Sequence, residues 1–121
     1  MGLRDILIEN KIYETEIYGH KWKVEVCILS EKAKNQYNCW IIKGKKIDKG
    51  TIEIVNITEE SLREASRTLF LNGVKNLSID GEDEKVDNET FEYLYNKLGL
   101  ALEWIENCIK DFNGNFFLMQ G

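Results

Sequence analysis

The clearest regular pattern in the chain is a strict alternation of apolar and polar residues between positions 22 and 28. Apolar side chains occupy every second position there, namely Trp22, Val24, Val26 and Ile28. Successive side chains of a strand point to opposite faces of a sheet. The alternation therefore predicts a strand with one buried face and one mostly polar face.

Other segments show weaker strand patterns, joined by short polar connections. The predicted strands are 11–18, 37–43 and 51–57, and Leu77 and Ile79 mark a short fifth strand or extended piece. The predicted connections are a turn at Gly19-His20, a polar loop at 30–36, and a hairpin loop at 44–50 with a glycine at each end. Strands that follow one another closely favour an antiparallel meander.

A first helix is predicted to follow Thr58, which is a favourable N-cap residue. Glu59 and Glu60 come next, and acidic side chains are stabilised at a helix N-terminus by the helix dipole. Asn72-Gly73 is a typical helix end. The pattern indicates a helix of about four turns before the last predicted strand.

A second, longer amphipathic helix is predicted between Asn88, as N-cap, and Asn113-Gly114. Its inner stripe repeats every seven residues, at Phe91, Leu98, Ile105 and Phe112. A second apolar line follows Tyr93, Leu100 and Trp104, which suggests a helix buried on more than one side. Gly99 is a position at which this helix can bend or be interrupted.

These elements predict a single α+β domain over residues 1–121. We expect an antiparallel sheet of four to five strands, in a meander, with one face packed by two helices, the C-terminal one long and amphipathic. A length of 121 residues is close to the commonest domain size and permits a substantial core. The last segment, 115–121, is an apolar C-terminal tail.

Charge is unevenly distributed along the chain. The formal net charge is −5 at pH 7. Residues 1–50 hold ten basic and seven acidic residues, whereas residues 51–121 hold six and fourteen. Direct nucleic-acid binding is not expected, because it needs a basic surface that displaces counterions from phosphates. An acidic half of the chain suits a partner with a basic surface.

The residues that carry most enzyme chemistry are sparse and scattered. His20 is the only histidine, and the three cysteines, Cys27, Cys39 and Cys108, are far apart. Zinc sites use closely spaced cysteine and histidine pairs, which are missing from the sequence. We expect no enzyme activity, no catalytic residue, no metal site and no cofactor.

The acidic connector between the last strand and the long helix is the densest charged stretch of the chain. It contains five carboxylates, Asp80, Glu82, Asp83, Glu84 and Asp87. The order of its ligands and glycine does not match an EF-hand loop. The triplet Asp83-Glu84-Lys85 has the Asp-x-Lys shape of metal-dependent nucleases, but so short a match often arises by chance. The connector is instead interpreted as an acidic patch that binds a basic partner.

Apolar residues beyond the inner stripe suggest a surface for self-association. The candidates are Tyr93, Leu100 and Trp104 on the long helix, together with Phe116, Phe117 and Leu118 in the tail. Contiguous apolar patches of several hundred Å² are rarely left exposed on monomers. We therefore expect a possible homodimer, with the tail contributing to the contact.

Two functions fit these features. The first is a non-enzymatic inhibitor, small and acidic, of the antidefence, anti-CRISPR-like or immunity type, which occupies a basic surface on a larger target protein. The alternative is a phage structural or assembly protein that self-associates through the long helix and tail.

The absence of proline and the excess of lysine over arginine are typical of an AT-rich bacterial or phage genome. With an odd number of cysteines and no apolar run of about 20 residues, a cytoplasmic protein without membrane contact is expected.

Overall fold

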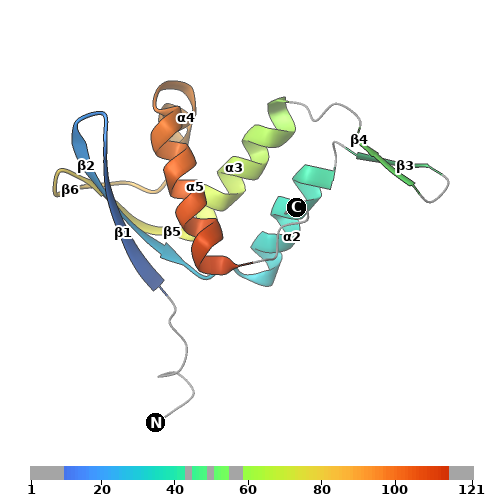
Figure 1. Ribbon diagram of the computed structural model, residues 1–121, viewed down its shortest axis with the longest axis horizontal. Helices are drawn as coiled ribbons and strands as arrows, with labels where there is room; N and C mark the ends of the chain where they lie inside the picture. The colour runs from blue at the N-terminus through green and yellow to red at the C-terminus, as the bar shows by residue number, and fades with distance from the viewer. Residues whose placement is uncertain (1–9, 43–44, 49–50, 55–58, 115–121) are drawn as a thin grey trace, which may run out of the picture.

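Strands and helices are mixed along the chain, as expected for an α+β protein (Figure 1). The structure, a computed structural model, describes residues 10–42, 45–48, 51–54 and 59–114. Its elements in chain order are β1 (Asn10–Ile17), β2 (His20–Cys27), α2 (Glu31–Ile42), β3 (Lys45–Asp48), β4 (Thr51–Ile54), α3 (Glu59–Gly73), β5 (Val74–Ile79), β6 (Glu82–Glu84), α4 (Asn88–Lys97) and α5 (Gly99–Asn113). The tail 115–121 lies outside the described residues.

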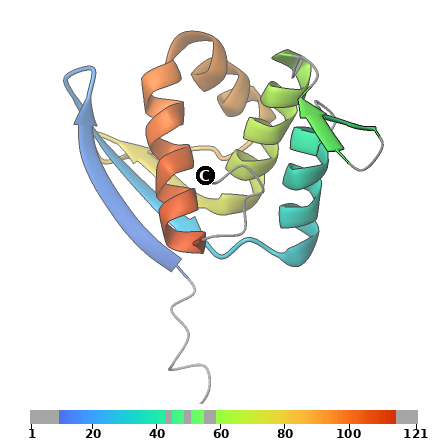
Figure 2. The ribbon, with the colours of Figure 1, turned by 45° about the vertical axis from the view of Figure 1, so that its right-hand side comes forward.

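The main sheet has four antiparallel strands in the order β1-β2-β5-β6. Helices α3 and α5 pack against one face of it, α4 contacts both of these helices, and α2 packs on α3 (Figure 2). This confirms the predicted α+β class, with an antiparallel sheet covered by helices. The opposite face of the sheet carries mostly polar side chains.

Two tight turns join the strands of the sheet, and each has two residues with positive φ. Tyr18 and Gly19 (57° and 76°) connect β1 to β2, and Asp80 and Gly81 (52° and 84°) connect β5 to β6. Such turns match the twist of antiparallel strands. The turn predicted at Gly19-His20 is displaced by one residue, because His20 is the first residue of β2 and already pairs with Ile17.

The predicted loop at 30–36 and strand at 37–43 are wrong, because this segment forms helix α2. Ser30 caps the helix: its hydroxyl accepts a hydrogen bond from the Ala33 backbone N–H at 3.1 Å. Ala33 and Ile41 are buried and Tyr37 is partly buried, at a spacing of four residues. Residues four apart lie on one face of a helix, and every second residue lies on one face of a strand. Positions 37 and 41 satisfy both rules, so over a short window the helical stripe resembles a strand face.

The sheet keeps the chain order of a meander, β1-β2-β5-β6 with antiparallel neighbours, but the predicted strand that begins at Thr51 is not part of it. Strands β3 and β4 pair only with each other, as a separate two-stranded sheet, so part of the predicted 44–50 loop is a strand. Strand β2 instead pairs with β5, its register shifting at Glu25/Val26. The β2–β5 neighbours are separated in sequence by α2, the β3–β4 hairpin and α3, an arrangement that no local pattern encodes.

The core lies between the sheet and helices α3, α4 and α5. Trp22, Val24 and Val26 are at most 3% exposed, which confirms the buried face of β2. Ile28, predicted on the same face, is 41% exposed, because β2 ends at Cys27 and the alternation no longer holds. These side chains share one hydrophobic cluster with α5 residues that include Ile105.

The predicted long C-terminal helix is two helices, α4 and α5. Leu98 leaves the helical region, with φ −129° and ψ 55°, and separates the two. Gly99 then begins α5, at the position where the sequence suggests an interruption. Phe91 and Ile105 of the predicted inner stripe are fully buried, while Leu98 and Phe112 are partly buried against the core.

Asn113, the last residue of α5, holds the end of β2 against the helices. Its side-chain oxygen accepts a hydrogen bond from the Leu29 backbone N–H at 2.8 Å. Its side-chain nitrogen donates to the carbonyls of Cys27, at 3.2 Å, and Ile109, at 2.9 Å. One amide therefore satisfies three backbone groups where the chain leaves the sheet for α2.

We predict that Asn113→Ala lowers the free energy of unfolding by about 2 kcal/mol, because partly buried backbone groups lose their partners. Asn35→Ala, at an exposed position of α2, should stay within about 0.5 kcal/mol of the wild type. Urea unfolding followed by circular dichroism measures both. Equal stability of the two variants would contradict this role of Asn113.

The Glu106 carboxyl of α5 makes stability depend on pH. Burial raises its pKa, and this effect outweighs a hydrogen bond from Ser66 and the positive charge of Lys110. The folded protein therefore holds this proton more tightly than the unfolded chain does. The contribution is fully present below the ordinary glutamate pKa of about 4.3 and is lost as the pH rises through the folded-state value.

We predict that Glu106→Gln is more stable than the wild type at pH 7 and that its advantage shrinks toward pH 4, where the wild-type carboxyl is protonated. Glu103→Gln, on an exposed position of the same helix, serves as the control without this pH dependence. Urea unfolding between pH 4 and pH 8 tests the difference. An advantage of Glu106→Gln that is independent of pH would show that the carboxyl is not desolvated.

Candidate functional site

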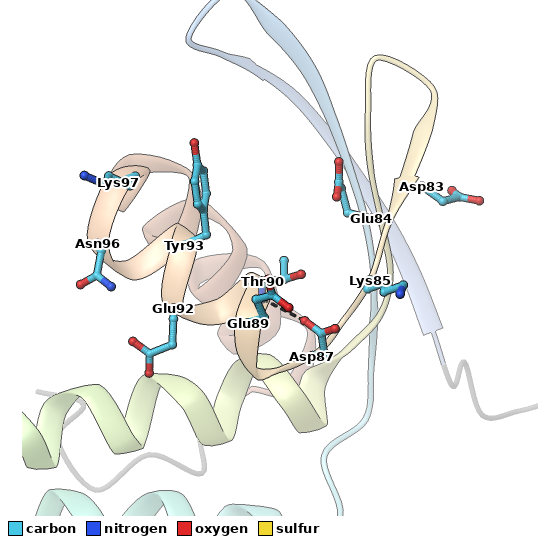
Figure 3. A pocket seen from close by; sticks show the side chains of 10 residues that line it. All are labelled: Asp83, Glu84, Lys85, Asp87, Glu89, Thr90, Glu92, Tyr93, Asn96 and Lys97. Carbon is cyan, nitrogen blue, oxygen red and sulfur yellow. Dashed lines mark hydrogen bonds between the residues drawn. The ribbon is translucent and has the colours of Figure 1, made fainter.

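An acidic hollow of the described surface lies between strand β6 and helix α4 (Figure 3). We call it the acidic groove; its volume is about 620 Å³. Five carboxylates and two lysines contribute to it. Its lining residues are Asp83, Glu84, Lys85, Asp87, Glu89, Thr90, Glu92, Tyr93, Asn96 and Lys97.

The register of β6 separates the predicted acidic patch into two faces. Glu84 pairs with Leu77, a core residue that is 1% exposed, so the side chain of Glu84 lies on the helix side of the sheet. Asp83 pairs with Ser78, on the polar side. Figure 3 shows the Glu84 side chain directed toward α4 and the Asp83 side chain directed away from it. The connector is therefore not one continuous acidic surface.

Asp87 is the N-cap of α4, a role that the sequence suggests for Asn88. Its carboxylate accepts a hydrogen bond from the Thr90 backbone N–H at 2.9 Å. This hydrogen bond lowers the pKa of Asp87, so the group stays ionised at the mouth of the groove. The same side chain thus starts the helix and contributes negative charge to the site.

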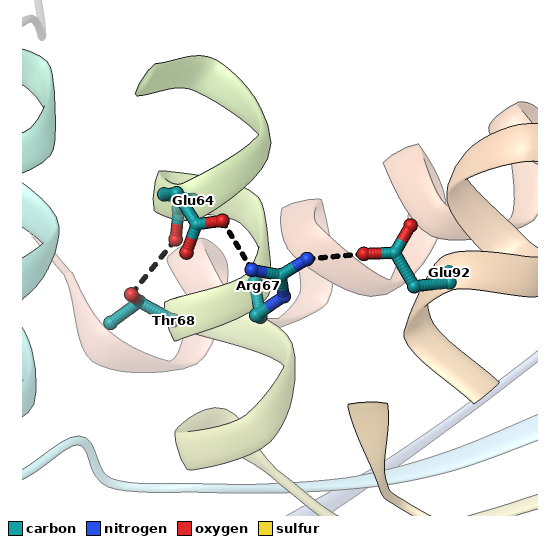
Figure 4. Close-up of polar contacts among 4 residues, drawn as sticks. All are labelled: Glu64, Arg67, Thr68 and Glu92. Carbon is teal, nitrogen blue, oxygen red and sulfur yellow. Dashed lines mark hydrogen bonds and ion pairs between the residues drawn. The ribbon is translucent and has the colours of Figure 1, made fainter. Parts of the chain in front are cut away.

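Arg67 of α3 fixes the position of α4 (Figure 4). Its guanidinium donates hydrogen bonds to Glu64 on the same helix and to Glu92 on α4. It also lies over the ring of Phe91, 5.3 Å from the ring centroid. Glu92 is therefore neutralised in place. In the part of the chain that the structure describes, Glu84 and Glu89 form no ion pair, so their charge is not compensated by one.

Tyr93 gives the acidic groove an exposed aromatic side chain. It is 62% exposed and lies on α4 opposite Glu84 (Figure 3). The sequence assigns Tyr93 to a self-association surface, together with Leu100 and Trp104. Leu100 is also 62% exposed, at the start of α5, whereas Trp104 is partly buried against the core. The tail residues of that surface, Phe116, Phe117 and Leu118, lie outside the described residues.

A second hollow adjoins the groove where the two hairpin turns approach the start of α5. We call it the tip hollow; its volume is about 470 Å³. It shares Glu84 with the acidic groove. Its lining residues are Tyr18, His20, Trp22, Ile79, Asp80, Glu82, Glu84 and Leu98. Glu82 and Asp80 of the predicted acidic patch therefore belong to this second hollow.

His20 and Asp80 connect the two turns at the tip hollow. The His20 Nδ1 atom lies 2.5 Å from the Asp80 Oδ2 atom. The other carboxylate oxygen of Asp80 accepts a hydrogen bond from the Lys21 backbone N–H at 2.9 Å. The Lys21 hydrogen bond, and then that of His20, lower the pKa of Asp80. No sequence pattern links positions 60 residues apart, so the pair is visible only in the fold.

Tyr18 supports the start of α5 from the opposite turn. Helix α5 has no side-chain hydrogen bond from its own N-cap residue, Leu98. Instead, the Tyr18 hydroxyl accepts a hydrogen bond from the Leu100 backbone N–H at 3.2 Å. The first N–H groups of a helix need such outside partners. This contact joins the β1–β2 turn to the junction between α4 and α5.

The sequence identifies part of this site and misses part. All five predicted acidic residues, Asp80, Glu82, Asp83, Glu84 and Asp87, line the two hollows, as does Tyr93. Sequence reasoning misses Glu89, although an acid in a helix's first turn is exposed by default, and it treats His20 as an isolated turn residue.

Two of the three cysteines are at least partly buried, whereas Cys39 is exposed. Cys108 is buried in the core cluster, and burial is the main cause that raises its pKa to about 11. Burial likewise raises the pKa of Cys27. A raised pKa disfavours the reactive thiolate at neutral pH. Among the described residues, no group of three or more histidine, cysteine or acidic side chains is arranged to hold a metal ion.

Comparison of the chain with protein-family models, with curated proteins and with solved structures found no match. Within the described ranges, no helix has the length and apolar character that crossing a membrane requires. The two hollows are therefore the features of the molecule that bear on its function.

We predict that Tyr18→Phe lowers the free energy of unfolding by about 1 kcal/mol, because the Leu100 N–H loses its acceptor. Tyr93→Phe is the matched control, since it also removes an exposed hydroxyl but leaves every hydrogen bond of the described residues in place. Thermal and urea unfolding compare the two. Equal losses in both variants would show that the Tyr18 contact does not support α5.

Proposed function

We propose that this protein is a non-enzymatic binding protein that uses the acidic groove and the tip hollow to occupy a basic surface of another protein. In this proposal it acts as a small inhibitor, of the antidefence, anti-CRISPR-like or immunity type. The observation that carries the proposal is the clustering of Glu84, Glu89 and exposed Tyr93 around one groove.

The charge of the groove supports a basic partner. Seven carboxylates line the two hollows together, against Lys85 and Lys97. Glu84 and Glu89 lack ion pairs among the described residues, so a lysine or arginine of a partner can pair with them without displacing an internal contact. Charge of one sign on a concave surface also accelerates association with an oppositely charged partner.

Tyr93 supports recognition of a protein surface that contains arginine. Guanidinium groups stack on aromatic faces, and their planar fork of donors also pairs with carboxylates. Tyrosine is enriched at the centres of protein interfaces because a rigid ring gives a large contact area at little entropic cost. The position of Tyr93 opposite Glu84 combines both groups at one place.

Inhibition follows from competition. A basic surface that binds phosphate groups binds carboxylates by the same charge-assisted hydrogen bonds. A protein with several carboxylates on one surface therefore competes with a nucleic acid or another acidic ligand of its target. Direct nucleic-acid binding by this chain is not expected, because its surface is negatively charged, as the phosphates are.

We place this activity in the cytoplasm, because the three cysteines of the chain are free thiols.

The absence of a nucleophile beside His20 supports a non-enzymatic role. A histidine base normally activates a serine, threonine or cysteine within hydrogen-bond distance. The described residues of the tip hollow include none of these three types. The His20–Asp80 pair therefore resembles a catalytic base with its orienting carboxylate, but it has no nucleophile to activate.

We predict that Glu84→Gln/Glu89→Gln weakens binding of a basic probe about fourfold at low salt, at roughly twofold for each exposed charge removed. The probe is a fluorescently labelled decalysine peptide, and the readout is anisotropy across a salt series. Glu14→Gln/Glu16→Gln is the matched control: it removes the same charge from exposed positions of β1. Equal weakening in both double variants would show that only net charge matters and would contradict a groove site.

The same three proteins serve as baits for affinity capture from host lysate, followed by mass spectrometry. A target of the groove is retained by the wild type and by Glu14→Gln/Glu16→Gln and is lost with Glu84→Gln/Glu89→Gln. A captured protein that ignores the groove variant is not the target that we propose.

One observation favours the alternative, a structural or assembly protein that self-associates as a homodimer or larger assembly. Leu100 is an aliphatic side chain that is 62% exposed. We expect Leu100→Glu to reduce self-association in this case, as measured by light scattering after size exclusion. A wild-type protein that remains monomeric at high concentration would overturn the alternative and leave the inhibitor proposal intact.

A further inference from the structure

The only histidine of the chain lies inside the acidic surface. His20 lines the tip hollow with Glu82 and Glu84, and it contacts Asp80. The His20 side chain is 57% exposed, so its ring remains accessible to water and to a partner. The histidine therefore lines the same hollow as Glu84, the carboxylate that also lines the acidic groove.

The groups that face His20 are predominantly acidic. The β5–β6 turn contributes Asp80, strand β6 contributes Glu82 and Glu84, and the β1–β2 turn contributes the neutral Tyr18 hydroxyl. Lys21 follows His20 on β2, and its backbone N–H binds Asp80. The junction of α4 and α5 contributes the apolar Leu98. A proton on His20 therefore adds the positive charge that this hollow otherwise lacks.

We infer that His20 makes binding of a basic partner sensitive to pH, with the strongest binding when the imidazole is neutral. This inference rests on the proposed function and specifies its regulation. Histidine is the side chain that ordinarily changes charge between pH 5 and 8, whereas carboxylates ionise below this range and lysines above it.

The direction of the effect follows from the charges. A protonated His20 neutralises one of the nearby carboxylates, Asp80 most directly, since Asp80 lies 2.5 Å away. It also repels a lysine or arginine that approaches Glu84. Because both groups are exposed, the interaction is screened by water and salt. We expect binding to be about two- to fivefold weaker at pH 5.5 than at pH 8 at low salt.

The test measures anisotropy of labelled decalysine at pH 8 and pH 5.5, because this probe keeps its charge at both values. His20→Gln keeps a donor toward Asp80 but does not titrate. His20→Lys keeps a positive charge at both values. We expect the wild type to weaken at pH 5.5, His20→Gln to bind as the wild type does at pH 8 under both conditions, and His20→Lys to bind weakly under both. Thermal unfolding of each protein at both pH values checks that the fold is retained.

The outcomes separate this inference from the function on which it rests. If the wild type binds decalysine at pH 8 through the groove, and His20→Gln weakens at pH 5.5 as much as the wild type does, the role of His20 is overturned and the proposed function stands. If the wild type does not bind decalysine at pH 8, the proposed function fails and the inference fails with it.

Discussion

The arrangement of the whole domain depends on a close approach between the end of α3 and helix α5. Gly73 is the last residue of α3, and Val74 is the first of β5, so the helix passes into the central sheet without a loop. A Cβ atom at Gly73 would lie 2.9 Å from the Ile109 Cγ2 atom. Only glycine allows this separation, because real Cβ contacts are longer. Helix, sheet and α5 are therefore in contact at one buried point.

Several other contacts extend from this point. Ile109 is fully buried, and its carbonyl accepts a hydrogen bond from Asn113, which also binds the chain on either side of residue 28. Strand β5 pairs with β2 on one side and β6 on the other. On the α3 side, Arg67 binds Glu92 and so positions α4. Both walls of the acidic groove, β6 and α4, are attached to the same α3–β5 unit.

This arrangement explains why residues of the site also have structural roles. Asp80 stabilises the β5–β6 turn against β2, Asp87 begins α4, and Glu92 pairs with Arg67. The position of each is determined by a backbone or side-chain partner; Asp80 and Asp87 add negative charge to a hollow, whereas the charge of Glu92 is balanced by Arg67. Glu84 and Glu89, which lack such partners in the described part of the chain, are the carboxylates that a binding partner can engage most directly. A rigid acidic frame with unpaired carboxylates suits recognition better than a flexible acidic loop does, because less entropy is lost on binding.

Local physics explains what sequence reasoning predicted correctly. The alternation around Val24 identifies a buried strand face because side-chain direction in a strand depends only on position. The helix end at Asn72-Gly73 and the interruption at Gly99 involve residues whose backbone preferences act over a few positions. The acidic composition of the connector is read directly from the sequence.

The tertiary structure alone decided the rest. Residues 37–43 fit a strand or a helix face equally well over so short a window, and packing of Tyr37 and Ile41 against the helices selected α2. The pairing of β2 with β5, the contact of His20 with Asp80 and that of Tyr18 with Leu100 join positions more than 45 residues apart. Sequence patterns encode which face of an element is apolar; which elements meet depends on how those faces pack together, and this determined the two hollows.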